Sequence, residues 1–502
     1  MFFSALAAIL GSLGGGLAQA IPPLPRGGAR CTSEVDCEML GDCVHGHCRC
    51  DPGWTGATCG TLRLLPADPK RDLIWPQNAV KPGPHDGTTA ARQHPISWGA
   101  SLIVDDDGIE HLFAEVGCYT YVTDMHARGF QIVHLEGPRE PPKSGGEEFL
   151  GPFAYKDTVL QQTRINPHVM RTPKGYAVFY VGYRHNSSNY TCTGAGVATA
   201  GALGADDPPI KPGECSNFDC YLAACQESQA KCENATGFPE WGHKCVWLND
   251  NCVNDPYKSV FGLAVAEADS LDGPWTLKNI AIEGNGGLNQ ETNPSGVTLP
   301  GGDVLLAFRW SVPLPPPPPR YGVKGVGFYD NVTELIGVAR AAVWGAPFVK
   351  IGPPSVPIST HQAEDPFIFR DSRGTIHILA HDIIRLNAVQ CNNSGWAGAH
   401  FFSTDPAGAH GSWHTPPHYP SVITNCSDSA GFGPGAYHVN VTWTDGTRTT
   451  FFRRERPELV FNAQGEPTHF ISGVERFAQD PGKPDNDQFS YTLVQRVDLS
   501  DE

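Results

Sequence analysis

Five segments of this chain repeat one pattern, in which an apolar strand, a short turn and a second apolar strand follow one another. They begin at Trp98, Asn166, Asn293, Glu364 and Arg456. Glycine and proline are frequent, with 56 and 44 residues, and long helical periodicity is absent. Repeated hairpins of this kind predict an all-β chain built as a five-bladed β-propeller. A large β-sandwich or two jelly rolls are the alternatives.

The sequence predicts four parts. Residues 1–20 read as a signal peptide, because an apolar run ends in a small-x-small pattern. Residues 31–59 hold six cysteines and are too short to build a core without disulfides. The β-rich texture of residues 75–500 predicts the propeller. Six further cysteines predict a cysteine-rich insertion within it, at residues 215–252.

Cysteine use and charge bear on location and partners. The chain has 16 cysteines, and disulfides persist in oxidising compartments, so we expect a secreted, extracellular protein. Seven Asn-x-Ser/Thr sequons are candidate glycan sites: Asn186, Asn189, Asn234, Asn331, Asn392, Asn425 and Asn440. The formal net charge of −17 argues against nucleic acid or an anionic membrane as a partner. No later window is long and apolar enough for membrane insertion, and no pattern indicates an oligomeric state.

The first cysteine unit resembles an EGF-like module. The resemblance rests on its cysteine spacing and on the phrase Cys48-Arg49-Cys50-Asp51-Pro52-Gly53-Trp54. Spacing alone leaves the disulfide connectivity open. The resemblance implies the pairs Cys31–Cys43, Cys37–Cys48 and Cys50–Cys59, and no acid precedes the first cysteine to bind calcium. A further pair, Cys391–Cys426, is expected in the propeller.

Two phrases of the propeller region resemble glycoside hydrolase family forty-three and its relatives, which include arabinanases and xylosidases. They are Glu364-Asp365-Pro366-Phe367-Ile368 and the strand ending in Ser270-Leu271-Asp272-Gly273-Pro274-Trp275. With its EGF-like module, the chain resembles an uncharacterised algal and oomycete type more than it resembles the bacterial enzymes. The resemblance covers roughly residues 90–475 and implies a five-bladed propeller that cuts glycosidic bonds with inversion. Inversion places the two carboxyl groups ~6.5–9.5 Å apart.

That family uses three acids on inner strands: an Asp base, an Asp that tunes a pKa, and a Glu acid. The resemblance places the acid at Glu364, with Asp365 beside it as a second catalytic candidate. The tuning position falls at Asn293, which cannot carry charge, and no acid stands near Trp98, where the base would fall. Glu291 is the candidate base, because it lies two residues before Asn293 and would share its strand face.

Asp86 and Glu455 are the other candidates for the base. A turn role is favoured for Asp86 and an ion-paired structural role for Glu455.

Six residues are predicted to bind substrate. Tryptophan rings stack on sugars, guanidinium forks bind carboxylates, and histidines bind hydroxyls. The residues are His168, Asn293, Arg309, Trp98, Arg454 and His381. For each single tryptophan, core packing is the favoured alternative. No metal-ligand pattern and no cofactor motif occur outside the cysteine units, although a structural calcium in the central channel remains an option.

The sequence therefore predicts a secreted glycoside hydrolase that cleaves a polysaccharide or oligosaccharide by carboxylate general acid/base catalysis. The alternative is a non-catalytic carbohydrate-binding or adhesion propeller that has lost its base. Asn293 and the missing acid in the first repeat favour that alternative, and the Glu364 phrase favours the enzyme.

Overall fold

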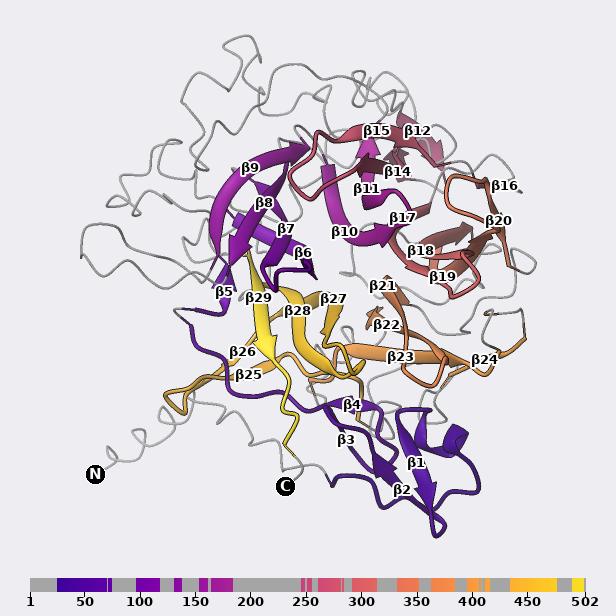
Figure 1. The fold of residues 1–502 in the computed structure, drawn as a ribbon, viewed down its shortest axis with the longest axis vertical. Coiled ribbons are helices and arrows are strands. Elements are labelled where there is room, and N and C mark those ends of the chain that lie inside the picture. The colour runs from indigo at the N-terminus through magenta and orange to yellow at the C-terminus, as the bar shows by residue number, and fades with distance from the viewer. Residues whose placement is uncertain are drawn as a thin grey trace, which may run out of the picture.

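A computed structural model describes residues 25–69, 71–74, 96–117, 131–137, 153–160, 164–183, 245–248, 251–254, 261–280, 282–283, 291–313, 332–351, 363–383, 395–405, 408, 411–415, 434–475 and 490–500. In this part of the chain, five sheets, antiparallel apart from one parallel pair of strands, stand around a common centre (Figure 1). The predicted five-bladed β-propeller is therefore confirmed, and the sandwich and jelly-roll alternatives are wrong.

The strands of each blade are given from the inner strand, nearest the centre of the ring, outward. Blade 1 is β6 (Ile96–Val104), β7 (Glu110–Gly117), β8 (Gln131–Gly137) and β9 (Ala154–Leu160). Blade 2 is β10 (Arg164–Thr172), β11 (Gly175–Tyr183), β14 (Phe261–Ala268) and β15 (Thr276–Asn279). Blade 3 is β17 (Glu291–Thr298), β18 (Val304–Pro313), β19 (Val332–Ala341) and β20 (Phe348–Lys350), with β16 (Ile282–Glu283) parallel to β20. Blade 4 is β21 (Ala363–Arg370), β22 (Ile376–Asp382), β23 (Gly398–Ser403) and β24 (Trp413–His414).

Blade 5 closes the ring with strands from both ends of the chain. It consists of β27 (Arg453–Phe461), β28 (Pro467–Glu475), β29 (Ser490–Arg496) and β5 (Leu73–Ile74). Leu493 pairs with Leu73, and Thr492 pairs with Ile74. The propeller thus includes β5, which precedes the expected start at residue 75. The sequence did not predict this strand, because two residues are too few to show a periodic pattern.

Every inner strand carries a bulge of one extra residue relative to its neighbour. The extra residue has a positive φ in each blade: Gly99 at 20°, Asn166 at 58°, Asn293 at 54°, Asp365 at 54° and Arg456 at 55°. A proline follows it in blades 2 to 5. Proline lacks a backbone N–H and is tolerated in a strand at a bulge, where the ladder is already interrupted. The recurring polar-proline phrase is therefore the signature of this bulge.

The cores lie between blades, where apolar side chains of neighbouring sheets meet. One cluster joins Leu305 and Ile336 of blade 3 to Ile368 and Ile378 of blade 4. Another joins Phe179 of blade 2 to blade 3. Each blade is thus held by the next, as expected of a ring of sheets.

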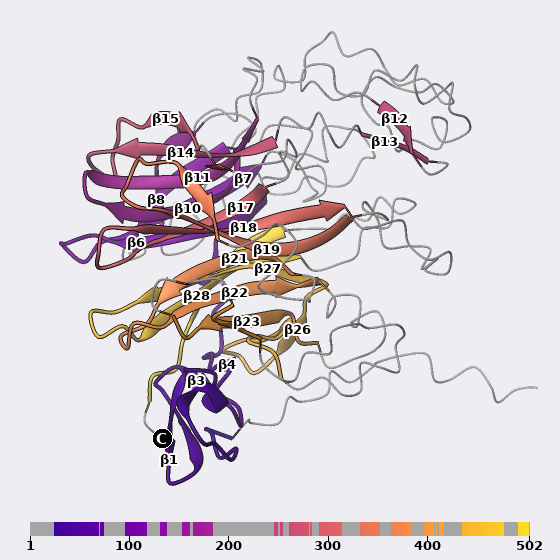
Figure 2. The ribbon, with the colours of Figure 1, turned by 90° about the vertical axis from the view of Figure 1, so that its right-hand side faces the viewer.

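The cysteine-rich module contains η1 (Glu34–Cys37), β1 (Gly41–Val44), β2 (His47–Cys50), β3 (Trp54–Thr55) and β4 (Thr61–Leu62). Its disulfides are Cys31–Cys43, Cys37–Cys48 and Cys50–Cys59, the pairs that the EGF-like resemblance implies. The module lies below β23 in both views of the ribbon (Figures 1 and 2).

Two hairpins complete the described elements. β12 (Cys245–Leu248) and β13 (Asn251–Asn254) pair within the predicted cysteine-rich insertion, and β25 (Asn440–Thr442) pairs with β26 (Arg448–Thr450). The rest of the insertion, Asp86, Cys391 and Cys426 lie outside the described residues. Among the described residues, no helix combines the length and apolarity needed to cross a membrane.

Candidate active site

The five bulges meet at the centre of the ring. The bulge residues Gly99, Asn166, Asn293, Asp365 and Arg456 all line one cavity of about 40 Å³. Since equivalent bulges aim equivalent side chains at one point, the cavity collects residues that are far apart in sequence. Because residues from all five blades line this cavity, it is the candidate functional site.

Hydrogen bonds join three side chains of this ring. Nδ2 of Asn166 donates to Oδ1 of Asn293, and Nδ2 of Asn293 donates to Oδ1 of Asp365. Nη1 of Arg456 lies 3.6 Å from the same oxygen of Asp365. Among the described residues, Oδ2 of Asp365 has no hydrogen-bond partner, although Asp365 is only 5% exposed. A buried oxygen of this kind calls for a proton, a water molecule or a ligand group.

Glu364 lies next to the cavity within a cluster of ionisable groups. Nη1 of Arg309 donates to Oε2 of Glu364 at 2.7 Å, and Nδ1 of His381 lies 3.2 Å from Oε1. One atom each of Glu364, Asp365, His381 and Glu455 lies within 4.8 Å of the other three. Blades 4 and 5 thus bring three carboxyl groups and an imidazole together.

The pKa values of the two neighbouring acids move in opposite directions. Burial acts to raise the pKa of Glu364, but the hydrogen bond from His381 and the charge of Arg309 outweigh it and hold that pKa well below its usual range. Burial raises the pKa of Asp365 to about 6; Arg456 opposes this rise, and the charges of Glu364 and Glu455 add to it. Below about pH 6, therefore, Glu364 is a carboxylate while Asp365 is a carboxylic acid.

His381 is the cation of the cluster. Burial acts to lower its pKa, but the carboxylates of Glu455 and Glu364 raise it to about 9. The cluster has the ligand types that a divalent cation takes, yet a metal ion would first have to displace a proton from His381. Arg309, which contacts Glu364, and Arg453, 3.4 Å from Glu455, balance the negative charge without a metal.

Glu115, which the sequence reading missed, contacts the bulge residue Asn166. It lies on β7 opposite Trp98, is 0% exposed, and its Oε2 accepts a hydrogen bond from the backbone N–H of Asn166 at 2.9 Å. Its Oε1 has no hydrogen-bond partner within the described part of the chain. Burial raises its pKa to about 7; Arg456 lowers it and Asp365 adds to the rise. A single acid among the otherwise apolar residues 112–116 is the sequence signal that could have identified it.

His168 and Asn293 line the cavity as predicted site residues. Both ring nitrogens of His168 contact protein atoms: Nδ1 lies 2.9 Å from Oε1 of Glu458, and Nε2 lies 2.9 Å from the carbonyl oxygen of Gly296. Ser101 donates to the same oxygen of Glu458 at 2.5 Å. This network links blades 1, 2, 3 and 5 and leaves only the carbon atoms of the imidazole to face a ligand.

Two predicted sugar-binding residues lie in the core instead. Trp98 is 0% exposed, and a Cβ atom on Gly473 of the adjacent blade would come within 2.7 Å of its indole. Arg454 is 1% exposed and donates to Ser472 and Gln495, with its guanidinium 4.8 Å from the ring centre of Phe470. Because no sugar can reach a fully buried side chain, the prediction that these two bind substrate is wrong.

Glu291 does not line the cavity either. It is 4% exposed, and Nζ of Lys350 donates to its Oε1 at 2.7 Å while lying 4.1 Å from the ring centre of Trp310. Side chains do not alternate with a period of two here, because a bulge lies between Thr292 and Ser295. Glu291 is an ion-paired residue of blade 3.

Replacing Arg309 with methionine is expected to raise the pKa of Glu364 by about 1–3 units, because an adjacent cation favours the carboxylate. Carboxyl titration by ¹³C NMR measures the shift. Arg309→Lys is the matched control, since it keeps the positive charge and should move the titration less. An unchanged titration in Arg309→Met would show that Arg309 does not hold Glu364 ionised.

No protein-family model matches the chain, and no curated protein matches it. Among solved structures, a family 62 α-L-arabinofuranosidase catalytic domain from Coprinopsis cinerea is 10% identical with a TM-score of 0.40, covering 87% of this chain and 98% of that one. A Lactobacillus brevis α-L-arabinofuranosidase is 11% identical with a TM-score of 0.38, covering 80% and 91%.

A third solved structure, a family 43 enzyme from Xanthomonas citri complexed with xylotriose, is 10% identical with a TM-score of 0.36, covering 82% of this chain and 89% of that one. All three likenesses are weak, with no more than 11% identity and a TM-score of no more than 0.40. They assign no residue role and no substrate to this chain.

Proposed function

We propose that this protein hydrolyses glycosidic bonds, with Asp365 as the proton donor and Glu364 as the ionised carboxylate. The observation that carries the proposal is that two adjacent acids, Asp365 lining the central cavity and Glu364 beside it, have pKa values shifted in opposite directions. Glycosidases need one protonated and one ionised carboxyl group, and environments that separate two pKa values assign those roles.

Asp365 is suited to protonate a leaving oxygen. Its Oδ1 is held by Asn293, its Oδ2 has no hydrogen-bond partner among the described residues, and it faces the cavity. The neutral acid can therefore present its proton on Oδ2 to the glycosidic oxygen. The leaving sugar departs with that proton as the bond to the anomeric carbon breaks, and Asp365 is left as a carboxylate.

Glu364 is suited to stabilise the positive charge that develops at the sugar. One carboxyl oxygen of Glu364 lies within 4.8 Å of one carboxyl oxygen of Asp365, which is closer than the ~6.5–9.5 Å between the carboxyl groups of an inverting enzyme. The expectation of inversion from the family resemblance is therefore not supported by these residues. The short separation favours retention, in which the carboxylate attacks the anomeric carbon and water later releases the sugar.

The rate should fall as pH rises through about 6, the value to which burial raises the pKa of Asp365. The acid must carry its proton to react, so the protonated fraction and the rate decline together above that pKa. Glu364 stays ionised over the same range, because its pKa is lowered. A pH–rate profile of kcat/KM checks this, and a rate that rises above about pH 6 would contradict the role of Asp365.

We place this activity outside the cell. Three disulfides in the module favour an oxidising compartment, because such bonds are rarely kept in the cytosol.

A non-catalytic carbohydrate-binding propeller is the second candidate. The ion pairs of Arg309 with Glu364 and of Arg453 with Glu455 favour it, since paired charges also serve as structural links.

A screen of the secreted protein and its Glu364→Gln variant against aryl glycosides and plant and algal polysaccharides separates the two. Hydrolysis by the wild type that the variant loses would support the enzyme. Sugar binding without turnover in both proteins would establish the binding propeller.

A further inference from the structure

Blade 1 contains a chain of four polar side chains that runs across its strands. Asp105, in the turn before β7, lies 3.1 Å from Nε2 of His111. Nδ1 of His111 lies 2.8 Å from Nε2 of His134 on β8, and His134 lies 3.6 Å from Asp157 on β9. Asp157, on the fourth strand of the same blade, has a side chain that is 44% exposed.

Blade 4 repeats this chain at the same places. Asp371, in the turn before β22, lies 3.3 Å from Nε2 of His377, and Nδ1 of His377 lies 3.0 Å from Nε2 of His400 on β23. Asp105 and Asp371 also accept the same backbone hydrogen bond, from the residue four positions later. Blade 4 thus has the first three members in equivalent positions.

The fourth member in blade 4 comes from the EGF-like module. Nδ1 of His400 lies 3.1 Å from Oε2 of Glu38, and Thr58 donates to Oε1 of Glu38 at 2.6 Å. Glu38 is 6% exposed, and a Cβ atom on Gly60 would overlap its carboxylate, so the module leaves room for it. The fourth strand of blade 4, β24, is only two residues long, and the module supplies the acid that β9 supplies in blade 1.

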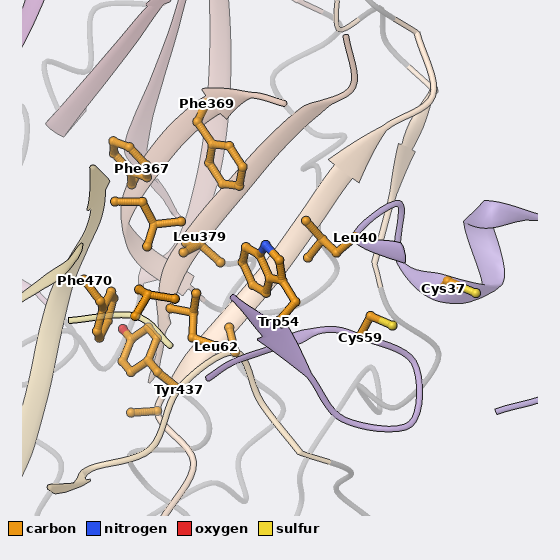
Figure 3. Packing of buried hydrophobic residues seen from close by; sticks show 14 of the residues in the cluster. Cys37, Leu40, Trp54, Cys59, Leu62, Phe367, Phe369, Leu379, Tyr437 and Phe470 are labelled. Atoms are coloured by element: carbon orange, nitrogen blue, oxygen red, sulfur yellow. The ribbon is translucent and has the colours of Figure 1, made fainter. Parts of the chain in front are cut away.

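Apolar packing joins the module to the same blade. Trp54 and Leu40 share one buried cluster with Phe369 and Leu379 of blade 4 (Figure 3). Trp54 is 2% exposed, and its ring centre lies 6.1 Å from that of His400. Charged contacts add to this: Arg373, in the turn between β21 and β22, pairs with Asp51 and donates to the carbonyl oxygen of Gly41 at 3.3 Å.

The blade that the module contacts is the one that carries the two acids. His377, Leu379 and His381 alternate along β22, so their side chains leave the same face of the strand. The first belongs to the chain that ends at Glu38, and the last contacts Glu364. Phe367 lies in the cluster with Trp54 and also lines the central cavity. One rigid strand face therefore connects the module to the cavity.

We propose that the EGF-like module is a built-in outer element of blade 4, and that Glu38 is a positioning residue which fixes β22 and thereby His381 and Glu364. This inference rests on the proposed function for its catalytic consequence. The module is thus a part of the active-site blade rather than a spacer.

Glu38→Ala tests the proposal. We expect kcat to fall by on the order of 10- to 100-fold with KM nearly unchanged, since small displacements of reacting groups cost this much. We also expect the titration of His381, near about 9 in the wild type, to shift. The NMR titration of His381 needs no substrate. If the wild type hydrolyses no substrate, the proposed function fails, but the titration still tests whether Glu38 positions His381.

Asp157→Asn is the matched control, because Asp157 is the equivalent acid of blade 1 and should leave both readouts unchanged. A Glu38→Ala protein that is less stable but keeps the wild-type kcat and His381 titration would overturn the positioning role. If that variant does not fold, Glu38→Gln keeps an oxygen acceptor for His400 and loses the charge. It should change both readouts in the same direction by less, and wild-type values in it would equally overturn the role.

Discussion

Replacing Asp365 with asparagine is expected to reduce hydrolysis by about 10²- to 10⁴-fold, the usual contribution of a general acid. The backbone should not change, because asparagine already occupies the equivalent bulge position in blades 2 and 3, at φ values of 58° and 54°. The amide keeps an oxygen for the hydrogen bond from Asn293 but has no acidic proton to give. The loss should therefore appear in the chemical step.

Aryl glycosides with different leaving groups make this test specific. A phenol that leaves without protonation depends little on the acid, so the variant should retain most activity on such a substrate and little on an alkyl glycoside. Glu291→Gln is the matched control: its carboxyl group is also buried on an inner strand, but it pairs with Lys350 and should matter by no more than a few fold. Equal losses on all leaving groups would contradict the role of Asp365 as proton donor.

Replacing Trp54 with alanine is expected to lower the free energy of unfolding of the whole protein by about 3–5 kcal/mol. The side chain is 2% exposed and lies between the EGF-like module and blade 4, so its removal leaves a cavity at the contact. Because the same cluster includes Phe470 of blade 5, the loss should not be confined to the module.

Denaturant unfolding followed by fluorescence and by circular dichroism measures this effect. Leu277→Ala is the control, since Leu277 is 53% exposed on β15 and should change stability by no more than about 0.5 kcal/mol. If the free energy of unfolding of Trp54→Ala lies within about 1 kcal/mol of the wild-type value, the module is joined to blade 4 by the chain alone and not by side-chain packing.

The sequence predicted the fold because the bulge of each inner strand has a short, recurring sequence pattern. A polar residue before a proline and an apolar hairpin recur in blades 2 to 5, and the proline marks the interrupted ladder. The disulfide pairs of the module followed from a resemblance with a fixed cysteine order. Closure of blade 5 by β5 could not be predicted, because two residues paired with a strand more than 400 positions away leave no pattern.

The candidate site was predictable only in part, for reasons that lie in the tertiary structure. Asp365 and Glu364 were found because they occupy a recurring phrase. Their roles were not, since these depend on Arg309, His381 and Arg456, which arrive from other strands. Strand alternation misassigned Glu291 because the bulge reverses the faces.

Burial explains why two of the predicted sugar-binding residues lie in the core. Trp98 and Arg454 have side chains that suit sugar binding, but both are buried, and residue type alone does not distinguish a platform from a core residue. Glu115 reaches the bulge of the next blade from a second strand, a contact that only the assembled ring creates.

Infrared titration tests the division of protons between Asp365 and Glu364 without any substrate. The difference between wild type and Asp365→Asn isolates the C=O stretching band of one protonated carboxyl group. We expect a band that is present in acid and disappears with an apparent pKa of about 6. A group that titrates near or below about 4, as an ordinary aspartate does, would contradict it, because Asp365 would then have no proton to donate at the pH where it is needed.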